Sequence, residues 1–389
     1  MAAHRARADR AYEVKDFELA YREYLETANA AGPGSEVPPA VWLRLARIAF
    51  YENRDAESAA FYSGAAAAAG LEPADRELLQ RLQTRLTWRQ LTPAAIGLGD
   101  GNVSALRVDG DDLWVGTWNG GVARLSLASG EARVFRQGRE SLLPSTVRCV
   151  EITPTRVWVG TYQGLFVYSK TADQWQEVRA FGGPEPQKVE ALRLADGRLY
   201  VGTLGGGLWR QEGEGWSRLS AGALPGDYVT CLEADGGELA IGTLTQGVVL
   251  LDLASSSFRS LDRLTRGLEA RNITVLLAEP GEALWIGTYG LGVYRWEGRA
   301  KRLAHFSRAG GQLADDWVLC AARARVGTYF GTLGGGLSRF NPETGDWAVL
   351  GFRQGVSSPD VPALAYGAPY LYLGSLGAGV TVLREGPRE

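Results

Sequence analysis

The sequence of 389 residues is poor in the residue types from which enzymes and metal sites are most often built. It has one methionine, three cysteines and two histidines, His4 near the terminus and His305 further along the chain. A catalytic triad would have to use His305, and a metal site made of several histidines is excluded. His305 lies in the segment RLAHFSR, for which we predict an outer strand and a packing or surface role for the imidazole.

Excess charge of one sign and long apolar runs are absent as well. The 41 Lys and Arg residues nearly balance the 44 Asp and Glu residues, and no basic run suits a phosphate backbone, so nucleic acid is not an expected partner. No apolar stretch reaches the roughly eighteen residues of a membrane span. The opening MAAHRARADR lacks the apolar segment of a signal peptide, which predicts either a protein made without one or a trimmed leader.

The short motifs of nucleotide, zinc, serine-hydrolase and calcium sites are missing too. We therefore predict that the protein is not an enzyme and that it uses no metal or cofactor. Asp109, Asp111 and Asp112 are interpreted as residues of a hairpin turn, with calcium binding there as the open alternative.

What the sequence does contain is one phrase repeated seven times. Each copy has an apolar run, a glycine, a threonine or serine and a glycine-rich bend, as in LWVGTWNGGVARL from Leu113 and LWIGTYGLGVYRW from Leu284. The anchor glycines follow one another at intervals of 40 to 45 residues, at Gly116, Gly160, Gly202, Gly242, Gly287, Gly331 and Gly374. This interval is the length of a four-stranded blade, so residues 87–389 are predicted to form an all-β seven-bladed β-propeller.

The last copy ends at VTVLREGPRE, without the aromatic-led fourth strand that other blades have, such as WQEV from Trp175. A similar segment, TWRQLT at residues 87–92, precedes the first blade. We predict that residues 88–91 pair with residues 380–383 and close the ring, because closure removes exposed strand edges.

Two further sets of residues recur at equivalent places in different blades. Three cysteines each lie eleven residues before the anchor glycine of their blade, namely Cys149, Cys231 and Cys320. We interpret them as small buried side chains that lie too far apart for disulfides. Four arginines share a place on the third strand, and we predict that they pack between blades, with a functional role as the open alternative, namely Arg124, Arg210, Arg295 and Arg339.

Residues 1–86 differ in kind, because apolar residues recur there at helical spacing without β alternation. The segment 12–30 resembles the second helix of a tetratricopeptide repeat, with Ala20 and Tyr24 at the matching places. A further helix pair and a capping helix at 73–85 follow, and the pair matches the repeat at Trp42, Leu45, Ala46, Ala59, Tyr62 and Ala65. The resemblance implies a small N-terminal all-α, TPR-like helical repeat domain.

The repeated phrase, together with LLPSTVRCV from Leu142 and FNPETGDW from Phe340, resembles the two-component regulator propeller repeat of bacteria. The resemblance covers about residues 93–385 and implies a seven-bladed fold with a ligand-sensing or interaction role, with a preference for the periplasm. Sensors of that family also carry a second propeller array, a membrane span and a kinase, none of which this sequence contains, so kinase function is not carried over. A propeller lyase similar to streptogramin lyase is the remote alternative, but such lyases depend on a histidine and magnesium, and no blade offers that histidine.

Candidate binding residues are found where the seven copies differ. In propellers, the bend after the second strand and the residues that lead into the inner strand share one face around the central channel. Aromatic and polar side chains alternate there, which suits recognition of a peptide or a sugar. The candidates are Trp118, Tyr162, Lys188, Tyr228, Arg271, Tyr289, Asp316 and Trp317. The open alternative is that the bend aromatics only wedge between blades.

Two hypotheses of function follow. In the first, the propeller face and the helical domain each hold a protein partner, which makes the chain a non-catalytic scaffold. In the second, the propeller is a sensor or receptor that captures a small ligand or glycan. Fold alone does not decide between them.

Overall fold

The computed structural model describes residues 2–30, 37–51, 58, 61–62, 64–66, 70–78, 88–138, 143–178, 187–219, 227–261, 271–351 and 355–385. The chain divides into two compact units, Met1–Arg89 and Gln90–Glu389. Within the described ranges, no helix combines the length and apolar character needed to cross a membrane.

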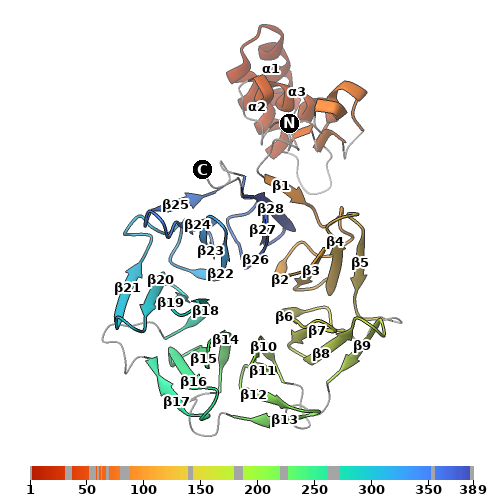
Figure 1. Cartoon of the computed structure of the whole chain (residues 1–389). Coiled ribbons are helices and arrows are strands. Elements are labelled where there is room, and N and C mark those ends of the chain that lie inside the picture. The colour runs from red at the N-terminus through yellow and green to blue at the C-terminus, as the bar shows by residue number, and fades with distance from the viewer. Residues whose placement is uncertain are drawn as a thin grey trace. The chain divides into compact units, whose positions relative to one another are not determined.

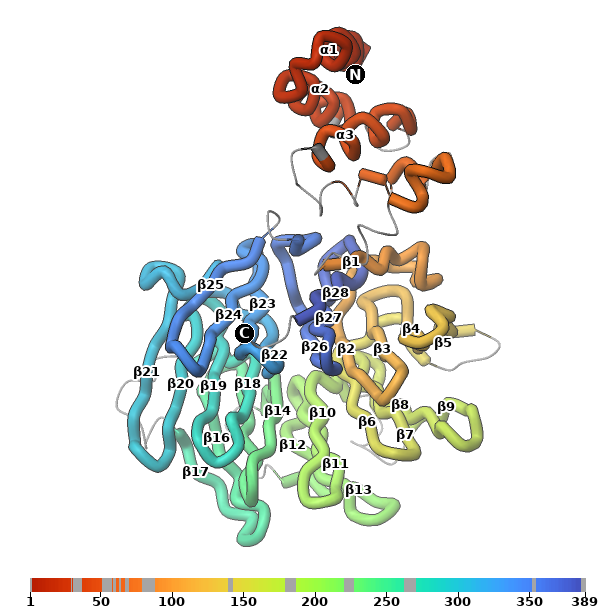
Figure 2. Tube along the Cα trace, turned by 45° about the horizontal axis from the view of Figure 1, so that its top comes forward, coloured from red at the N-terminus to blue at the C-terminus, as the bar shows by residue number. Residues whose placement is uncertain are grey.

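The second unit is a seven-bladed β-propeller, as predicted, and each blade is a four-stranded sheet. The first three blades contain β2 (Val103–Asp109), β3 (Asp112–Thr117), β4 (Val122–Ser126), β5 (Ala132–Phe135), β6 (Val147–Ile152), β7 (Arg156–Thr161), β8 (Gly164–Ser169), β9 (Gln174–Glu177), β10 (Val189–Ala195), β11 (Arg198–Thr203), β12 (Gly207–Glu212) and β13 (Gly215–Arg218). Figures 1 and 2 show the inner strands of the blades facing the middle of the ring.

The next three blades contain β14 (Val229–Asp235), β15 (Glu238–Thr243), β16 (Val248–Asp252), β17 (Phe258–Ser260), β18 (Ile273–Glu279), β19 (Ala283–Thr288), β20 (Val293–Glu297), β21 (Arg302–Phe306), β22 (Val318–Ala324), β23 (Gly327–Thr332), β24 (Leu337–Phe340) and β25 (Trp347–Leu350). His305 lies on the outer strand β21, where its ring stacks on Tyr294 at 4.4 Å and its Nε2 lies 2.7 Å from the Leu291 carbonyl. This histidine therefore has a packing role.

The last blade is assembled from both ends of the propeller sequence. Its strand order is β1 (Trp88–Leu91), β28 (Val380–Arg384), β27 (Tyr370–Gly374) and β26 (Ala363–Gly367). The Gln90 side chain donates to the Ala378 carbonyl and accepts a hydrogen bond from Thr381 Oγ1 at 2.8 Å. A strand that comes before the first blade thus covers the edge that β28 would otherwise expose.

Each anchor glycine lies on the second strand of its blade, where the inner strand of the same blade and the inner strand of the next blade both pack against it. A Cβ atom on Gly160 would lie 2.4 Å from Cys149 Sγ and 2.5 Å from Cγ1 of Val189, which belongs to the next blade. The other two cysteines face their anchor glycines in the same way, and all three are free thiols. Burial raises the pKa of the Cys231 thiol to about 12 and raises the pKa of the other two. Cys320 is buried as predicted, whereas Cys149 and Cys231 are half-buried, and all three line the central cavity. Their contacts with the anchor glycines indicate a packing role.

The threonine or serine after each anchor glycine closes the bend. Thr117 Oγ1 donates to the Gly121 carbonyl at 3.1 Å, and Gly121 has a φ of 79°. A Cβ atom on Gly121 would lie 2.2 Å from the Phe135 carbonyl oxygen, so only glycine fits. The same hydrogen bond recurs in the other six blades, at Thr161–Gly164, Thr203–Gly207, Thr243–Gly247, Thr288–Gly292, Thr332–Gly336 and Ser375–Gly379.

The core between blades is largely aromatic, and the third-strand arginines lie beside it. Trp285 is 1% exposed, and its ring lies 5.1 Å from Phe330 and 5.2 Å from Phe340 of the next blade. Arg295 is the register partner of Trp285 on the neighbouring strand and is bound to Glu279 at 2.5 Å. The other three arginines also pair with second-strand aromatics of their own blades, at Trp114–Arg124, Tyr200–Arg210 and Tyr329–Arg339. These register partners lie in the same sheet, but the side chains project from its face toward the next blade. Arg124 interacts there with Tyr168 of the next blade, which agrees with the prediction of packing between blades at this position.

The first unit contains α1 (Ala2–Glu13), α2 (Phe17–Asn29) and α3 (Pro39–Tyr51). The Asp16 side chain caps α2 by accepting a hydrogen bond from Leu19 N at 3.1 Å. Several residues of the repeat pattern form its core, namely Ala20, Tyr24, Leu45, Ala46, Tyr62 and Ala65. The predicted position Ala59 and residues 79–85 of the predicted capping helix lie outside the described residues.

Candidate functional site

The predicted binding residues lie on one face of the propeller, which we call the mouth face. It consists of the bends between the second and third strands and the residues that lead into the inner strands. Register explains why these segments meet, because the first inner-strand residue pairs with the last residue of the second strand, as Val103 does with Thr117. Trp118 follows directly after Thr117, and its amide donates to the Asn102 carbonyl at 3.0 Å.

Backbone hydrogen bonds between neighbouring blades hold the mouth face in place. Amides of bend glycines donate to lead-in carbonyls of the next blade, from Gly207 to Asp227 at 3.0 Å and from Gly247 to Arg271 at 3.0 Å. Within a blade, the Lys188 carbonyl accepts from the Leu204 amide at 2.9 Å. These bonds use only backbone atoms, so the side chains at the same positions are free to differ between blades.

Exposed aromatic side chains gather on this face. Five aromatic residues are between 40% and 46% exposed, namely Trp118, Tyr162, Tyr228, Tyr289 and Trp317. Across the described parts of the chain, they are the complete set of exposed large aromatic residues. All five were predicted as site residues from the differences between copies. Exposed apolar area that is concentrated on one face is typical of a binding surface.

Two of these aromatics form a stacked pair between neighbouring blades. Tyr289 follows β19 and Trp317 precedes β22, and an isolated β-bridge joins them. Their ring centroids lie 4.4 Å apart at an interplanar angle of 26°. The pair therefore presents a rigid aromatic surface whose shape depends little on side-chain rotation.

A second cluster on the mouth face is built around Arg148. Its guanidinium lies 5.9 Å from the Trp118 ring centroid and 5.2 Å from that of Tyr162. Glu190 of the next blade accepts from Arg148 Nε at 3.0 Å and from Nη2 at 2.5 Å. Burial alone would lower the pKa of Arg148, but the hydrogen bonds and charge of Glu190 outweigh it and raise the pKa. A permanent cation thus lies between two aromatic rings.

The charged candidates differ in exposure and in the hydrogen bonds that they make to the rest of the protein. Lys188 and Arg271 are exposed. The Asp316 carboxylate accepts from the Arg308 amide at 2.7 Å, and its carbonyl accepts from the amides of Gly290 and Gly292 at 3.1 and 2.9 Å. Asp316 therefore anchors the loops that carry Tyr289 and Trp317. This structural role explains why an aspartate stands there, and it requires no ligand.

Below the mouth face, side chains of the seven inner strands line a central cavity of about 440 Å³. Its wall includes Arg148 and Glu190, neither of which was predicted as a site residue. The sequence did contain a signal for them, because the residue at their position in the repeat varies between the blades, and only Thr230 and Thr274 are the same. In chain order these residues are Ser104, Arg148, Glu190, Thr230, Thr274, Leu319 and Pro362. Within the described ranges, no group of three or more His, Cys, Asp or Glu residues could hold a metal ion.

The propeller fold is shared with solved structures of extracellular domains. One is the extracellular domain of a protein named as the hybrid two component system BT3049 from B. thetaiotaomicron, with a TM-score of 0.64 and 14% identity over 77% of this chain and 42% of that chain. Another, named as the one component system BT4673 from the same organism, has a TM-score of 0.62 and 19% identity over 77% of this chain and 44% of that chain. The computationally designed Ika8 protein has a TM-score of 0.53 and 14% identity over 75% of this chain and 98% of that chain.

At these identities the likeness shows a common fold. The chain spans less than half the length of the two B. thetaiotaomicron domains. It matches no protein-family model and no curated protein. The resemblance to sensor propellers is therefore supported at the level of architecture.

Proposed function

We propose that the propeller is a non-catalytic receptor that binds a small ligand, a glycan fragment, on the mouth face. The observation that carries this proposal is the collection of five half-exposed aromatic side chains around one end of the channel. Such side chains offer a large apolar area and lose little conformational entropy when they bind. Exposing them to water without a partner has no benefit for stability.

Sugar rings suit this surface because they combine apolar C–H faces with hydroxyl edges. The stacked pair of Tyr289 and Trp317 offers a flat face to the former. The exposed amine of Lys188 and the exposed Tyr228 offer hydrogen-bonding groups to the latter. A ligand that spans several blades would use both kinds of contact at once.

The comparisons support the receptor hypothesis over the scaffold hypothesis. The proteins with this fold that were found are extracellular domains of proteins named as hybrid two component or one component systems. This support is an analogy of fold and not of site. It agrees with an extracytoplasmic location for the propeller, which belongs to the same proposal.

The scaffold hypothesis remains the second candidate because the chain also has a helical unit whose core follows a helical repeat pattern. Such repeats hold peptide partners on extended surfaces. In that case the mouth face would bind a protein segment in place of a sugar.

The test is a glycan array combined with ligand-induced thermal shift on the full chain. We expect a glycan hit that raises the melting temperature and that is lost in Trp317→Ala and Tyr228→Ala. Val349→Ala is the control, because Val349 is equally exposed at 46% but lies on the outer strand β25. The control should bind like the wild type.

A pull-down with the same three variants separates the hypotheses. Reproducible protein partners that are lost with Trp317→Ala and Tyr228→Ala, together with no glycan response, would support the scaffold. If neither substitution changes the binding of any ligand or partner, the mouth face is not the site.

A further inference from the structure

The wall of the central cavity is divided into two chemically different arcs. Seven inner-strand residues lie at the same level, because each is the register partner of the second-strand residue two before the anchor glycine. In chain order they are Arg107, Glu151, Arg193, Glu233, Leu277, Ala322 and Ala365. All of them except Glu151 line the cavity. Blades one to four thus have basic and acidic residues in alternation at this level, and blades five to seven have apolar side chains.

Within the charged arc, the carboxylates lie deeper than the guanidinium groups. The Arg107 side chain is 41% exposed, whereas its partner Glu151 is 12% exposed. The same order holds for Arg193 at 29% and Glu233 at 10%, which lie 2.7 Å apart. A molecule inside the cavity would therefore meet guanidinium groups first, with the carboxylates behind them.

Arg107 is the least satisfied of these arginines. Its Nη2 lies 3.7 Å from Glu151 Oε2, and among the described residues its one hydrogen bond goes from Nη1 to the Leu106 carbonyl at 3.1 Å. A guanidinium has five N–H donors in a planar fork, so most of those of Arg107 are unused. Glu151 Oε2 is buried without a hydrogen-bond donor among the described residues. Arg107 can therefore donate to another anion with these unused N–H groups while it stays beside Glu151.

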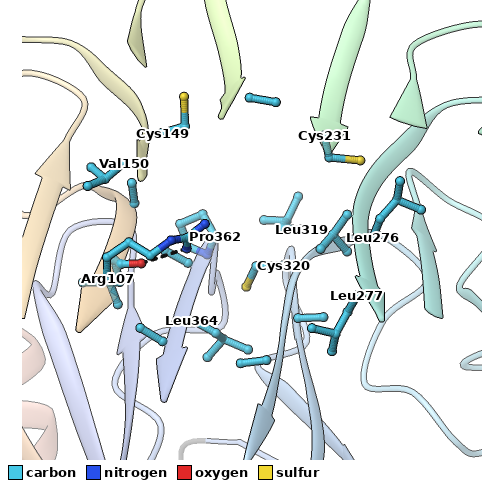
Figure 3. Close-up of a pocket in the computed structure, with 18 of the residues that line it drawn as sticks. Arg107, Cys149, Val150, Cys231, Leu276, Leu277, Leu319, Cys320, Pro362 and Leu364 are labelled. Carbon is cyan, nitrogen blue, oxygen red and sulfur yellow. Dashed lines mark hydrogen bonds between the residues drawn. The ribbon is translucent and has the colours of Figure 1, made fainter. Parts of the chain in front are cut away.

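A second guanidinium lines the cavity in blade six. Arg323 is exposed, and within the described ranges no carboxylate forms an ion pair with it. The opposite arc offers no competing charge at the level of Arg107, because its residues there are Leu277, Ala322 and Ala365. Figure 3 shows Arg107 on one side of the cavity and Leu276, Leu277 and Leu319 on the other.

We infer that the central cavity binds a small organic anion with an apolar body. Its carboxylate, sulfate or phosphate head would take a bidentate pair of hydrogen bonds from Arg107, and its body would lie against the partly exposed Leu277 and Leu319. The cavity of about 440 Å³ is in the usual range for such ligands. The residues proposed to contact this anion differ from the exposed aromatics of the mouth face, although Arg148 belongs both to the cavity wall and to the cluster with Trp118 and Tyr162.

The test is isothermal titration calorimetry of the full chain with three probes, octanoate, octylamine and acetate. Octanoate has both the head and the body, octylamine has the opposite charge and acetate lacks the body. We expect octanoate to bind at least about tenfold more tightly than either of the others, because a charged hydrogen-bonded pair and a buried chain each contribute this much. Equal binding of octylamine, or no binding of octanoate, would overturn the inference.

Variants locate the site. Arg107→Gln should weaken octanoate binding about tenfold to a hundredfold. Arg107→Lys keeps the charge beside Glu151, protects the fold and should still weaken binding by losing the bidentate fork. The control is Arg133→Gln, which removes an exposed arginine paired with Asp173 on the outside of the propeller. Unchanged octanoate affinity in folded Arg107→Lys and Arg107→Gln would contradict the site.

One further variant separates this inference from the proposed function. Trp317→Ala should abolish glycan binding on the mouth face and leave octanoate affinity unchanged. If the octanoate affinity falls with Trp317→Ala and not with Arg107→Lys, the anion binds at the mouth face and the cavity site is wrong.

Discussion

The bends of the mouth face and the wall of the cavity are built from the same repeat, yet they follow opposite rules. All seven bends have the same hydrogen bond from a threonine or serine to a glycine. The wall, at one level, changes from Arg107 and Arg193 in the early blades to Ala322 and Ala365 in the last two. A bend must fit against the backbone of the next blade, whereas a side chain in the cavity can change as long as a charged partner on the next blade, such as Glu233 for Arg193, changes with it. The comparison teaches that stability depends on the shared residues and binding on the varied ones.

Removing the strand that closes the ring should have the largest effect on this shared framework. Deleting residues 1–92 removes β1 and its bonds from Gln90 to the last blade, so we expect a fall in melting temperature on the order of 10 °C. A chain that begins at residue 87 is the control, since it keeps β1 and loses the helices. Equal melting temperatures and a monomeric state for both chains would show that β1 does not close the ring.

An added methyl group at an anchor glycine should have the next largest effect. Gly160→Ala would place Cβ 2.4 Å from Cys149 Sγ and 2.5 Å from Val189 Cγ1, so the two blades must move apart. We expect a loss of about 3 kcal/mol in the free energy of unfolding, measured by urea denaturation. Gly237→Ala is the matched control, because a Cβ atom there meets nothing within 4 Å. A loss of less than about 1 kcal/mol relative to that control would refute the packing role of the glycine.

The charged arc of the cavity should give the protein a pH dependence that an apolar wall would not. Burial raises the pKa of Glu233 to about 7, although the charges of Arg193 and Arg107 act to lower it. The folded state then holds a proton that the unfolded state releases near pH 4.5, so stability falls as the pH rises from about 4.5 through 7. The loss should reach roughly 2–3 kcal/mol by pH 8.

Urea denaturation of Glu233→Gln between pH 4.5 and pH 8 checks this prediction. The variant should lose the part of the slope that Glu233 contributes, while the exposed substitution Glu214→Gln keeps it. The carboxylate Glu151 and the cations Arg193 and Arg107 remain in both proteins. If Glu233→Gln and the wild type have the same pH profile, Glu233 is ionised throughout and its environment is more polar than the structure indicates.

Much of the fold follows from the repeat alone. The interval between anchor glycines predicts seven blades, and the absence of a last outer strand directs attention to Trp88. The mouth-face aromatics were also predictable, because Trp118, Tyr162 and Tyr289 stand at one place in the repeat where the other four blades have leucine. Because the repeat occurs seven times, its copies can be aligned with one another, and this alignment shows which positions are constant and which vary.

The cavity wall was not predicted, and the reason is a β-bulge. In each of the first six blades the inner strand shifts register near its start, as between Val103 and Ala105. A bulge changes which residues face the cavity, so simple alternation along the strand assigns the faces wrongly. The ion pairs of Arg148 with Glu190 and of Arg193 with Glu233 cross between blades, and sequence spacing does not show them.

The smallest expected effect on stability gives the most direct test of the central claim. The claim is that the mouth-face aromatics serve binding and are not wedges between blades. The measurement is the free energy of unfolding of the double variant Tyr228→Ser with Trp317→Ser, which removes side chains that are 46% and 41% exposed. We predict a loss below about 1 kcal/mol, well under that of Gly160→Ala. A loss equal to or greater than that of Gly160→Ala would contradict the claim and assign these aromatics to the fold.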